Sequence, residues 1–464
     1  MLFNSVAFLV FLPVVFGVYW ALPRRGQNLF VLAASYFFYG WWDWRFLGLI
    51  FLSSLVDYLA GRAIARRRRP RGWLALSLGV NLGALGVFKY LDFGIESMSW
   101  MLRAVGFEPH PTTLSVLLPV GISFYTFQTL SYTIDIYRGK TEPTRDLIAF
   151  FAFVAFFPQL VAGPIERARN LLPQFERDRS FDDVAASDAA LQILYGFWLK
   201  MVVADNIAMA ADWCFAKPSP TGWIVLLGAW AFAFQIYGDF AGYSHIAIGC
   251  ARLFGFSLMR NFAYPYFARS PVEFWRRWHI SLSTWFRDYV YIPLGGNRRG
   301  RGRRYFNLLV TFGLSGLWHG AGLNFVVWGL YHGVLAALPW RREAFDVDRP
   351  LGKSGRSARA LLGAVVTFHL VALGWILFRS ETLAHAWTMI RALGQNWSGE
   401  PVWNYWMWPA LATVALEWWQ RKRPHGLSLS EAPAVVRWAV AFAVAILIVW
   451  FGRIETVPFI YFQF

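Results

Sequence analysis

The stretch LSGLWHGAGLNF, residues 314–325, decides the fold that the sequence predicts. His319 lies there among apolar and small residues, between two segments rich in basic residues, 297–304 and 340–357. Basic loops of membrane proteins stay on the cytoplasmic side. We therefore expect the chain between them to enter the membrane and return to the same side. Its glycines would permit a break in the helix, which at that depth is tolerated only inside protein or around a cavity.

The composition extends this prediction to the whole chain. Of its 464 residues, 57% are hydrophobic and 15% are charged, whereas soluble domains carry about 25% charged residues. Apolar runs of the length needed to cross a bilayer recur along the sequence. We predict an all-α, polytopic membrane protein that forms one domain over residues 1–464. It should have about 10–12 transmembrane helices, with re-entrant and interfacial helices around a central cavity.

The net charge of +17 would suit a nucleic-acid-binding protein, but its distribution argues otherwise. Arginines cluster in short loops between apolar runs, as in residues 65–72 and 297–304, which is the pattern of cytoplasmic loops. We therefore expect membrane lipid and no nucleic acid as a partner. Arg24 and Arg25 follow the first apolar run, and RKR at 421–423 precedes the last, so both chain termini should lie outside the cytoplasm.

The sequence contains no motif of a resident cofactor, a metal or a serine nucleophile. Cys214 and Cys250 do not form a C-x-x-C pair, and G-x-S-x-G, P-loop, H-E-x-x-H and dinucleotide patterns do not occur. A histidine without a dedicated nucleophile suits general-base chemistry on an incoming hydroxyl or a thioester. We therefore predict no metal and no bound cofactor.

The histidines of the apolar runs are the first catalytic candidates. A titratable ring at membrane depth costs free energy, which favours function for His319; a hydrogen-bonded packing role is the alternative. His332 does not lie a whole number of helical turns further on, so it should not share a helix face with His319. A structural role is favoured for His332, whereas His245 and His279 stay open. His425, in a polar loop, is expected at the surface.

The stretch 271–300 mixes arginines with tryptophans and tyrosines. At helical spacing Trp275, Trp278 and Leu282 fall on one stripe, and Arg277 lies on another. One interpretation is an amphipathic helix in the cytoplasmic interface, with its arginines on lipid phosphates. The other is a polar cluster beside a solvated internal channel.

Eight motifs that run from near the first residue to the last belong together. They are SYFFYGWWDWRF (35–46), GISFYTFQTLSYTIDIYRG (121–139), FFPQLVAGPIERA (156–168), YGDFAGYSHIAIG (237–249), EFWRRWHISLSTWFRDYVYIPLGGNRRG (273–300), GLWHGAGLNFVVWGLYHG (316–333), WILFRS (375–380) and PFIYFQF (458–464). With them the chain resembles the membrane-bound O-acyltransferase (MBOAT) family, in its bacterial alginate O-acetyltransferase branch. The motifs are specific for the superfamily and much less so for the substrate.

This resemblance implies a function and a set of site residues. The protein would move acetyl groups across the bacterial inner membrane to O-acetylate an exopolysaccharide such as alginate. His319, in the W-H-G motif, matches the catalytic histidine of the family. The candidates that line the cavity or bind the donor are His279, Arg287, Asp288, Asp239 and Asn324. His245 is a departure, because the family usually has an aspartate at this position.

The resemblance also implies a donor, a partner and a relay. Acetyl-CoA would supply the acetyl group, and Arg298–Arg304 would attract its phosphates. A periplasmic acetyltransferase would act on the polysaccharide, with both termini of this chain on its side of the membrane. Tyr461, in the terminal PFIYFQF, would take the acyl group and pass it outward. The alternative for Tyr461 is an aromatic anchor at the lipid interface.

Other functions stay open at this stage. Within the acyltransferases they are peptidoglycan O-acetylation and D-alanyl transfer to teichoic acid. A transporter would also bury charges beside broken helices, although paired short segments in two halves are not evident. A non-catalytic scaffold of a polysaccharide export complex is the last class.

Overall fold

A computed structural model describes residues 1–108, 118–161, 163–340, 358–395, 397–398, 407–453 and 457–462. Over these residues the chain is helical and forms no strand, which confirms the predicted all-α class. The helices follow in chain order: α1 (Val6–Trp20), α2 (Arg24–Gly40), η1 (Trp44–Phe46), α3 (Leu47–Ala65), α4 (Pro70–Leu85), η2 (Gly86–Tyr90), α5 (Leu91–Ala104), α6 (Ile122–Tyr137), α7 (Leu147–Ala155), α8 (Phe157–Leu160), α9 (Ala168–Glu176), α10 (Asp183–Phe197), η3 (Trp198–Ala204), α11 (Asp205–Phe215), α12 (Gly222–Leu253), η4 (Pro265–Phe267), α13 (Pro271–Arg277), α14 (Ile280–Phe286), η5 (Arg287–Tyr291), α15 (Gly300–His319), α16 (Leu323–Ala337), α17 (Ala358–Arg379), α18 (Leu383–Gln395), α19 (Met407–Trp419), α20 (Ala434–Phe451) and η7 (Ile460–Phe462).

Six of the helical stretches in the described ranges are long and apolar enough to cross a bilayer. They are Trp44–Ala65, Pro70–Ala104, Asp183–Phe215, Gly222–Leu253, Ala358–Arg379 and Ala434–Phe451. Three shorter apolar helices accompany them, namely Val6–Trp20, Leu147–Leu160 and Leu323–Ala337. The protein is therefore a multi-pass membrane protein, and the larger number of about 10–12 crossings remains a prediction.

The segment around residues 314–325 forms the predicted broken hairpin. Helix α15 ends at His319, Gly320 and Gly322 are extended, and α16 begins at Leu323. The two helices cross closely, because a Cβ added at Gly316 would lie 2.1 Å from the carbonyl oxygen of Phe325. Both helices carry a G-x-x-x-G motif here, GLWHG at 316–320 and GLYHG at 329–333, which permits close packing of membrane helices.

The crossing gives a prediction about folding. Replacing Gly329 with Leu should prevent the hairpin from closing, since a Cβ there would lie 2.2 Å from the carbonyl oxygen of Phe312. We expect a loss of at least about 1–3 kcal/mol of stability, seen as a lower thermal midpoint of the detergent-solubilised protein. Gly313→Ala is the matched control, because its Cβ would meet only Leu330 at 3.5 Å. Equal midpoints for the two variants would contradict the close crossing.

The stretch 271–300 does not form one amphipathic helix, so the first of the two interpretations is wrong. Helix α13 ends at Arg277, Trp278 is extended, and His279 has a left-handed backbone with φ of 43° before α14 begins. This break turns Trp278 and His279 into the protein. Arg277, which that interpretation places on lipid phosphates, is buried and forms an ion pair with Glu273 at 2.8 Å.

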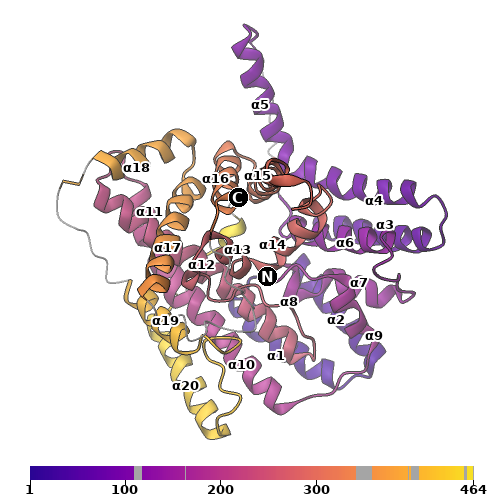
Figure 1. Ribbon diagram of the computed structural model, residues 1–464. Helices are drawn as coiled ribbons and strands as arrows, with labels where there is room; N and C mark the ends of the chain where they lie inside the picture. The colour runs from indigo at the N-terminus through magenta and orange to yellow at the C-terminus, as the bar shows by residue number, and fades with distance from the viewer. Residues whose placement is uncertain are drawn as a thin grey trace.

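The core connects the two ends of the chain. One hydrophobic cluster extends from Met1 to Ile460. Phe3 and Phe459 both pack on Tyr243 of α12, with ring centroids 5.6 Å and 4.6 Å from it. Figure 1 shows both chain ends in the middle of the ribbon, whereas α5 stands out from the rest of the protein. The described part of the C-terminal tail is therefore packed inside the protein.

Candidate active site

A cavity of about 300 Å³ brings His319 and Tyr461 together. It is lined by Trp42, Lys89, Leu118, Pro119, Val120, Gly121, Ile122, Ser123, Phe124, Val161, Trp318, His319, Pro458 and Tyr461. His319 is the last residue of α15, and the glycine break that follows leaves its ring at the edge of this space. The two catalytic candidates that the sequence placed far apart therefore share one wall.

Tyr461 approaches His319 closely. Their ring centroids are 5.5 Å apart, and the Tyr461 ring also lies 4.6 Å from that of Phe240 and 6.3 Å from that of His279. Tyr461 is half-buried and contacts residues inside the protein, a position that favours the relay over the alternative of an aromatic anchor at the lipid interface. A phenol beside an imidazole on a buried cavity can undergo proton transfer and nucleophilic attack.

A buried ion pair holds the tail that carries Tyr461. The backbone N–H of Ile460 donates to Asp239 Oδ2 at 2.6 Å, and Lys200 Nζ contacts Asp239 Oδ1 at 2.6 Å and Asp205 Oδ1 at 2.8 Å. Asp239, predicted to line the cavity or bind the donor, lies behind the cavity wall and anchors the tail. Sequence analysis did not identify Lys200 and Asp205, although a lysine inside the apolar run 189–214 was a visible signal.

This anchor gives a second prediction. Asp239→Ala should release the tail, because it removes the acceptor of the Ile460 N–H and one of the two carboxylates that pair with Lys200. Hydrogen bonds to charged groups contribute about 1.5–3 kcal/mol each. We expect faster proteolysis of the C-terminal tail in detergent, with the rest of the protein intact. Asp239→Asn keeps an acceptor oxygen and should have a smaller effect; a tail as protected in Asp239→Ala as in the wild type would contradict the anchor.

His279 is a further polar side chain next to His319 in the candidate site. Its ring centroid lies 6.4 Å from that of His319 and 4.5 Å from that of Phe240. Neither ring nitrogen of His279, nor Nδ1 of His319, has a hydrogen-bond partner among the described residues. Buried polar groups of this kind are usually satisfied, so these nitrogens are suited to bind a substrate or water.

Two of the predicted residues of the hairpin region lie away from the cavity wall. His332 is fully buried, with its ring 5.0 Å from that of Trp275 and 5.1 Å from that of Trp328. Asn324 donates from Nδ2 to the carbonyl oxygen of Ser380 at 2.9 Å, which ties the start of α16 to the end of α17. Neither residue lines the cavity that holds His319 and Tyr461.

Arg287 and Asp288 also lie outside this cavity. They form an ion pair with each other at 2.8 Å, and the side chain of Arg287 is 58% exposed. The carbonyl oxygen of Asp288 accepts from Arg138, so the pair belongs to the packing between η5 and the end of α6. Arg287 and Asp288 therefore do not line the cavity that holds His319 and Tyr461.

His245, where the family usually has an aspartate, is buried beside a second polar cluster. Its Nδ1 lies 3.2 Å from Gln192 Nε2. Asp188, the nearby acid, pairs with Arg252 at 2.9 Å and with His425 at 3.2 Å. The prediction that His425 lies at the surface is wrong, because its loop folds over α10 and brings the ring to this carboxylate.

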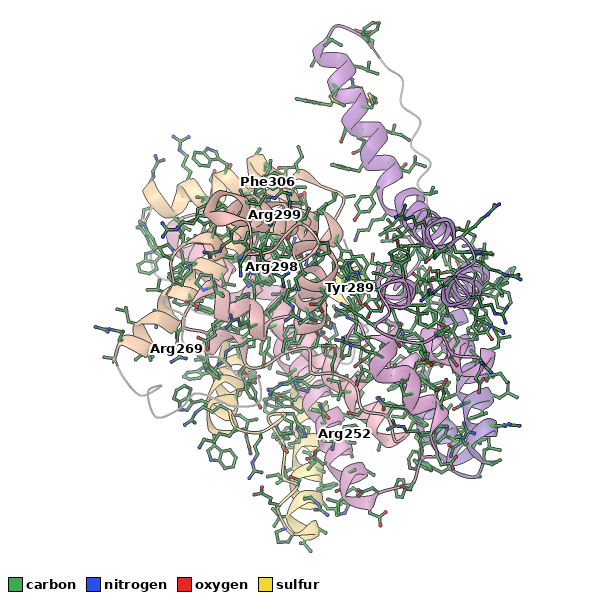
Figure 2. The ribbon with its side chains drawn as sticks, turned by 45° about the vertical axis from the view of Figure 1, so that its right-hand side comes forward. Arg252, Arg269, Tyr289, Arg298, Arg299 and Phe306 are labelled. Atoms are coloured by element: carbon green, nitrogen blue, oxygen red, sulfur yellow. The ribbon has the colours of Figure 1, made fainter. Side chains whose placement is uncertain are left out.

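The basic loop before α15 is distant from His319 along the helix. Arg299 directly precedes α15, with Arg298 beside it (Figure 2). The 20 residues of the helix separate them from the cavity by about 30 Å. The arginines of 298–304 do not line the cavity, so any donor that they attract must reach His319 along the length of the helix.

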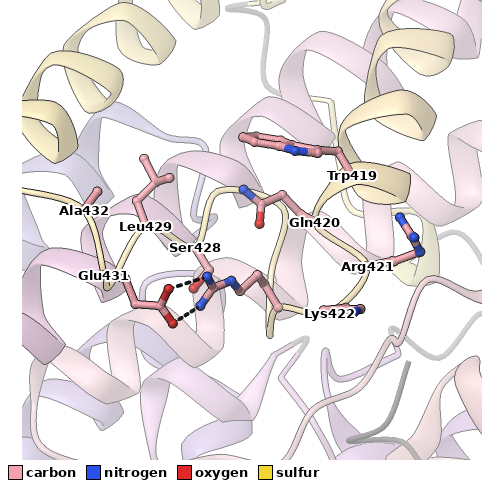
Figure 3. A pocket seen from close by; sticks show the side chains of 9 residues that line it. Trp419, Gln420, Arg421, Lys422, Ser428, Leu429, Glu431 and Ala432 are labelled. Carbon is pink, nitrogen blue, oxygen red and sulfur yellow. Dashed lines mark hydrogen bonds and ion pairs between the residues drawn. The ribbon is translucent and has the colours of Figure 1, made fainter. Parts of the chain in front are cut away.

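A second hollow of about 490 Å³ lies under the loop between α19 and α20 (Figure 3). Arg423 and Glu431 form an ion pair across it at 2.5 Å. Its lining includes Arg421 and Lys422 but no histidine or tyrosine. The combination of a base and a nucleophile is therefore found in the first cavity.

The described residues form a multi-pass helical protein with an imidazole and a phenol on one cavity, an arrangement that suits a group-transfer enzyme of the membrane. Comparison with known proteins defines this class. The model of the membrane-bound O-acyltransferase family matches residues 143–338. The probable alginate O-acetylase of Azotobacter vinelandii is 45% identical over 399 residues, covering 85% of this chain and 78% of the relative.

Two further relatives support the same assignment. The probable alginate O-acetylase of Pseudomonas aeruginosa is 45% identical over 401 residues, with 85% of this chain and 75% of the relative covered. The peptidoglycan O-acetyltransferase of Helicobacter pylori is 34% identical over 430 residues, with 85% and 80% covered. The chain belongs to the membrane-bound O-acyltransferase family and is an O-acyltransferase.

Proposed function

We propose that this protein transfers acetyl groups from cytoplasmic acetyl-CoA, through Tyr461, to the outer side of the membrane for the O-acetylation of alginate. The observation that carries the proposal is the shared cavity of His319 and Tyr461, whose ring centroids are 5.5 Å apart. An imidazole accepts a proton near neutral pH, and a phenol oxygen becomes a nucleophile when it loses one.

The transfer can be written from these two side chains. The phenol oxygen of Tyr461 attacks the thioester carbonyl while His319 takes the phenol proton. The C–S bond then breaks, and the departing thiolate takes the proton from His319. The products are an acetyl ester at Tyr461 and free CoA. An acceptor hydroxyl on the outer side next takes the acetyl group and returns a proton to the Tyr461 oxygen.

The orientation of the chain supports delivery to the outer side. Trp42 follows α2, and α2 and α15 both have arginines in their first turns and run towards the cavity. With the arginines in the cytoplasm, the cavity faces outward. Phe3 and Phe459 pack on the same tyrosine, which supports both termini on one side. We place the protein in the bacterial inner membrane with both termini in the periplasm, beside a periplasmic acetyltransferase partner.

The identities favour alginate as the polymer. The two alginate O-acetylases are 45% identical to this chain, whereas the peptidoglycan O-acetyltransferase is 34% identical over a similar share. Peptidoglycan O-acetylation remains the second candidate, because it also transfers an acetyl group to a hydroxyl of a polymer. D-alanyl transfer to teichoic acid would use the same site with an aminoacyl donor.

The test is to delete the protein from the bacterium that encodes it and compare the acetyl esters of alginate and peptidoglycan by mass spectrometry. We expect the loss of ester from alginate, restored by the wild-type chain and not by His319→Ala. Loss of acetyl ester from peptidoglycan alone would show that peptidoglycan, and not alginate, is the acceptor polymer. Loss of D-alanyl ester would show that the transferred group is D-alanyl and not acetyl. Restoration of the ester by the His319→Ala variant would support a non-catalytic scaffold. Unchanged esters on every polymer after the deletion would refute acyl transfer and favour a transporter.

A further inference from the structure

The π-helical turn η2 holds the end of the helix that carries His319. Tyr90 donates its hydroxyl to the carbonyl oxygen of Leu317 at 2.8 Å, and Lys89 donates from Nζ to those of Trp318 at 2.7 Å and His319 at 3.1 Å. The last carbonyls of a helix have no partner inside the helix, and their partial negative charge attracts a cation. Lys89 and Tyr90 therefore cap the C-terminus of α15 from outside.

Lys89 differs from Tyr90 in its charge and in its position, because only Lys89 lines the cavity with His319 and Tyr461. An ammonium group carries three N–H donors. Two of them are used by the carbonyls of α15, and no third hydrogen-bond acceptor occurs among the described residues, although Nζ also lies 5.9 Å from the centroid of the Trp318 ring. The third N–H of the positively charged Lys89 ammonium group therefore remains available at the edge of the cavity. π-helical turns of this kind occur often at functional sites.

We propose that Lys89 is a catalytic residue whose third N–H donates to the acyl oxygen at the moment this oxygen becomes negatively charged. The inference rests on the proposed acyl transfer at His319. When the Tyr461 oxygen attacks, the carbonyl π electrons move to the acyl oxygen, and Lys89 stabilises this oxyanion. When the C–S bond breaks, the electrons return to form the ester carbonyl, and Lys89 keeps its proton throughout. A fixed donor of this type acts mainly on the transition state.

The competing interpretation is that Lys89 only caps α15. Tyr90 is the matched control for it, because it caps the same helix end without a charge and without contact with the cavity. If capping were the whole role, Lys89→Met and Tyr90→Phe would reduce activity by similar factors and through the same loss of stability. If the charge acts on the oxyanion, Lys89→Met would lower kcat much more, with KM for acetyl-CoA nearly unchanged.

The experiment compares the wild type, Lys89→Met and Tyr90→Phe in proteoliposomes, with the initial rate of CoA release from acetyl-CoA as the readout. We expect Lys89→Met to lower kcat by about 10²–10³-fold, as removal of one oxyanion donor does, and Tyr90→Phe to lower it by less than about threefold. In Lys89→Cys, alkylation with 2-bromoethylamine restores an ammonium group at nearly the original distance and should recover activity. The native Cys214 and Cys250 are buried and provide the unalkylated background.

Two results would overturn the inference about Lys89: equal losses in Lys89→Met and Tyr90→Phe, or no recovery after alkylation of Lys89→Cys although mass spectrometry shows the modified side chain. A parallel measurement of polymer acetylation in cells separates this failure from that of the proposed function. If His319→Ala abolishes acetylation while Lys89→Met retains it, only the role of Lys89 fails. If deletion of the whole chain leaves acetylation intact, both proposals fail.

Discussion

His319→Ala is expected to abolish polymer O-acetylation while the protein stays in the membrane at its normal level. The imidazole lies at the end of α15 on the cavity, and His319 is the one histidine among the described residues that line this cavity with Tyr461. Removal of a general base lowers a rate by about 10²–10⁴-fold. The loss should appear in kcat for acetyl transfer, measured as CoA release in proteoliposomes and as acetyl ester on the polymer in cells.

His369→Ala is the matched control for this loss. His369 lies on α17, where Nδ1 contacts the carbonyl oxygen of Val365 at 2.8 Å, and it does not line the cavity. We expect nearly wild-type acetylation from this variant. Comparable acetylation in His319→Ala and the wild type would refute the catalytic role of His319, whatever the membrane level of the protein.

Tyr461→Phe is expected to reduce acetylation by about a hundredfold or more, because the covalent intermediate cannot form without the hydroxyl. The substitution keeps the aromatic ring and its packing on His319 and Phe240. The backbone anchor at Asp239 also stays, since it binds the N–H of Ile460. Stability and membrane level should therefore be unchanged, which separates loss of the hydroxyl from loss of the tail.

Tyr243→Phe is the control for removal of a buried phenol. Tyr243 contacts Phe459 of the same tail, but its hydroxyl donates to Asn4 and does not line the cavity. We expect this variant to retain most of the acetylation. Unchanged acetylation in Tyr461→Phe would show that the acyl group does not pass through the phenol.

The hairpin around His319 was predictable because its signals are local. Basic loops on both sides fixed the direction of the chain, and glycines at 316, 320 and 322 marked the break. The structure adds the reason for those glycines, since a side chain at Gly320 would overlap the ring of Phe325. The matching G-x-x-x-G motifs at 316–320 and 329–333 are a further local signal for the close packing of α15 and α16.

Other parts of the site could not be predicted from local pattern. The left-handed backbone of His279 contradicts the helical spacing of its neighbours, because tertiary contacts of residues 261–263 hold the break open. The Lys200–Asp239 pair and the contact of Lys89 with α15 join residues far apart in the chain. Asp239 of this pair also binds the backbone of Ile460 in the tail, so the residues that hold Tyr461 next to His319 could not be predicted from local sequence.

The most direct test of the account is mass spectrometry of the C-terminal peptide after brief incubation of the purified protein with acetyl-CoA and no acceptor. We predict an acetyl group on Tyr461 in the wild type, formed together with free CoA, and none in His319→Ala. Release of CoA at the wild-type rate with an unmodified Tyr461, or equal acetylation of Tyr461 in the His319→Ala variant, would contradict the central claim that these two side chains act together.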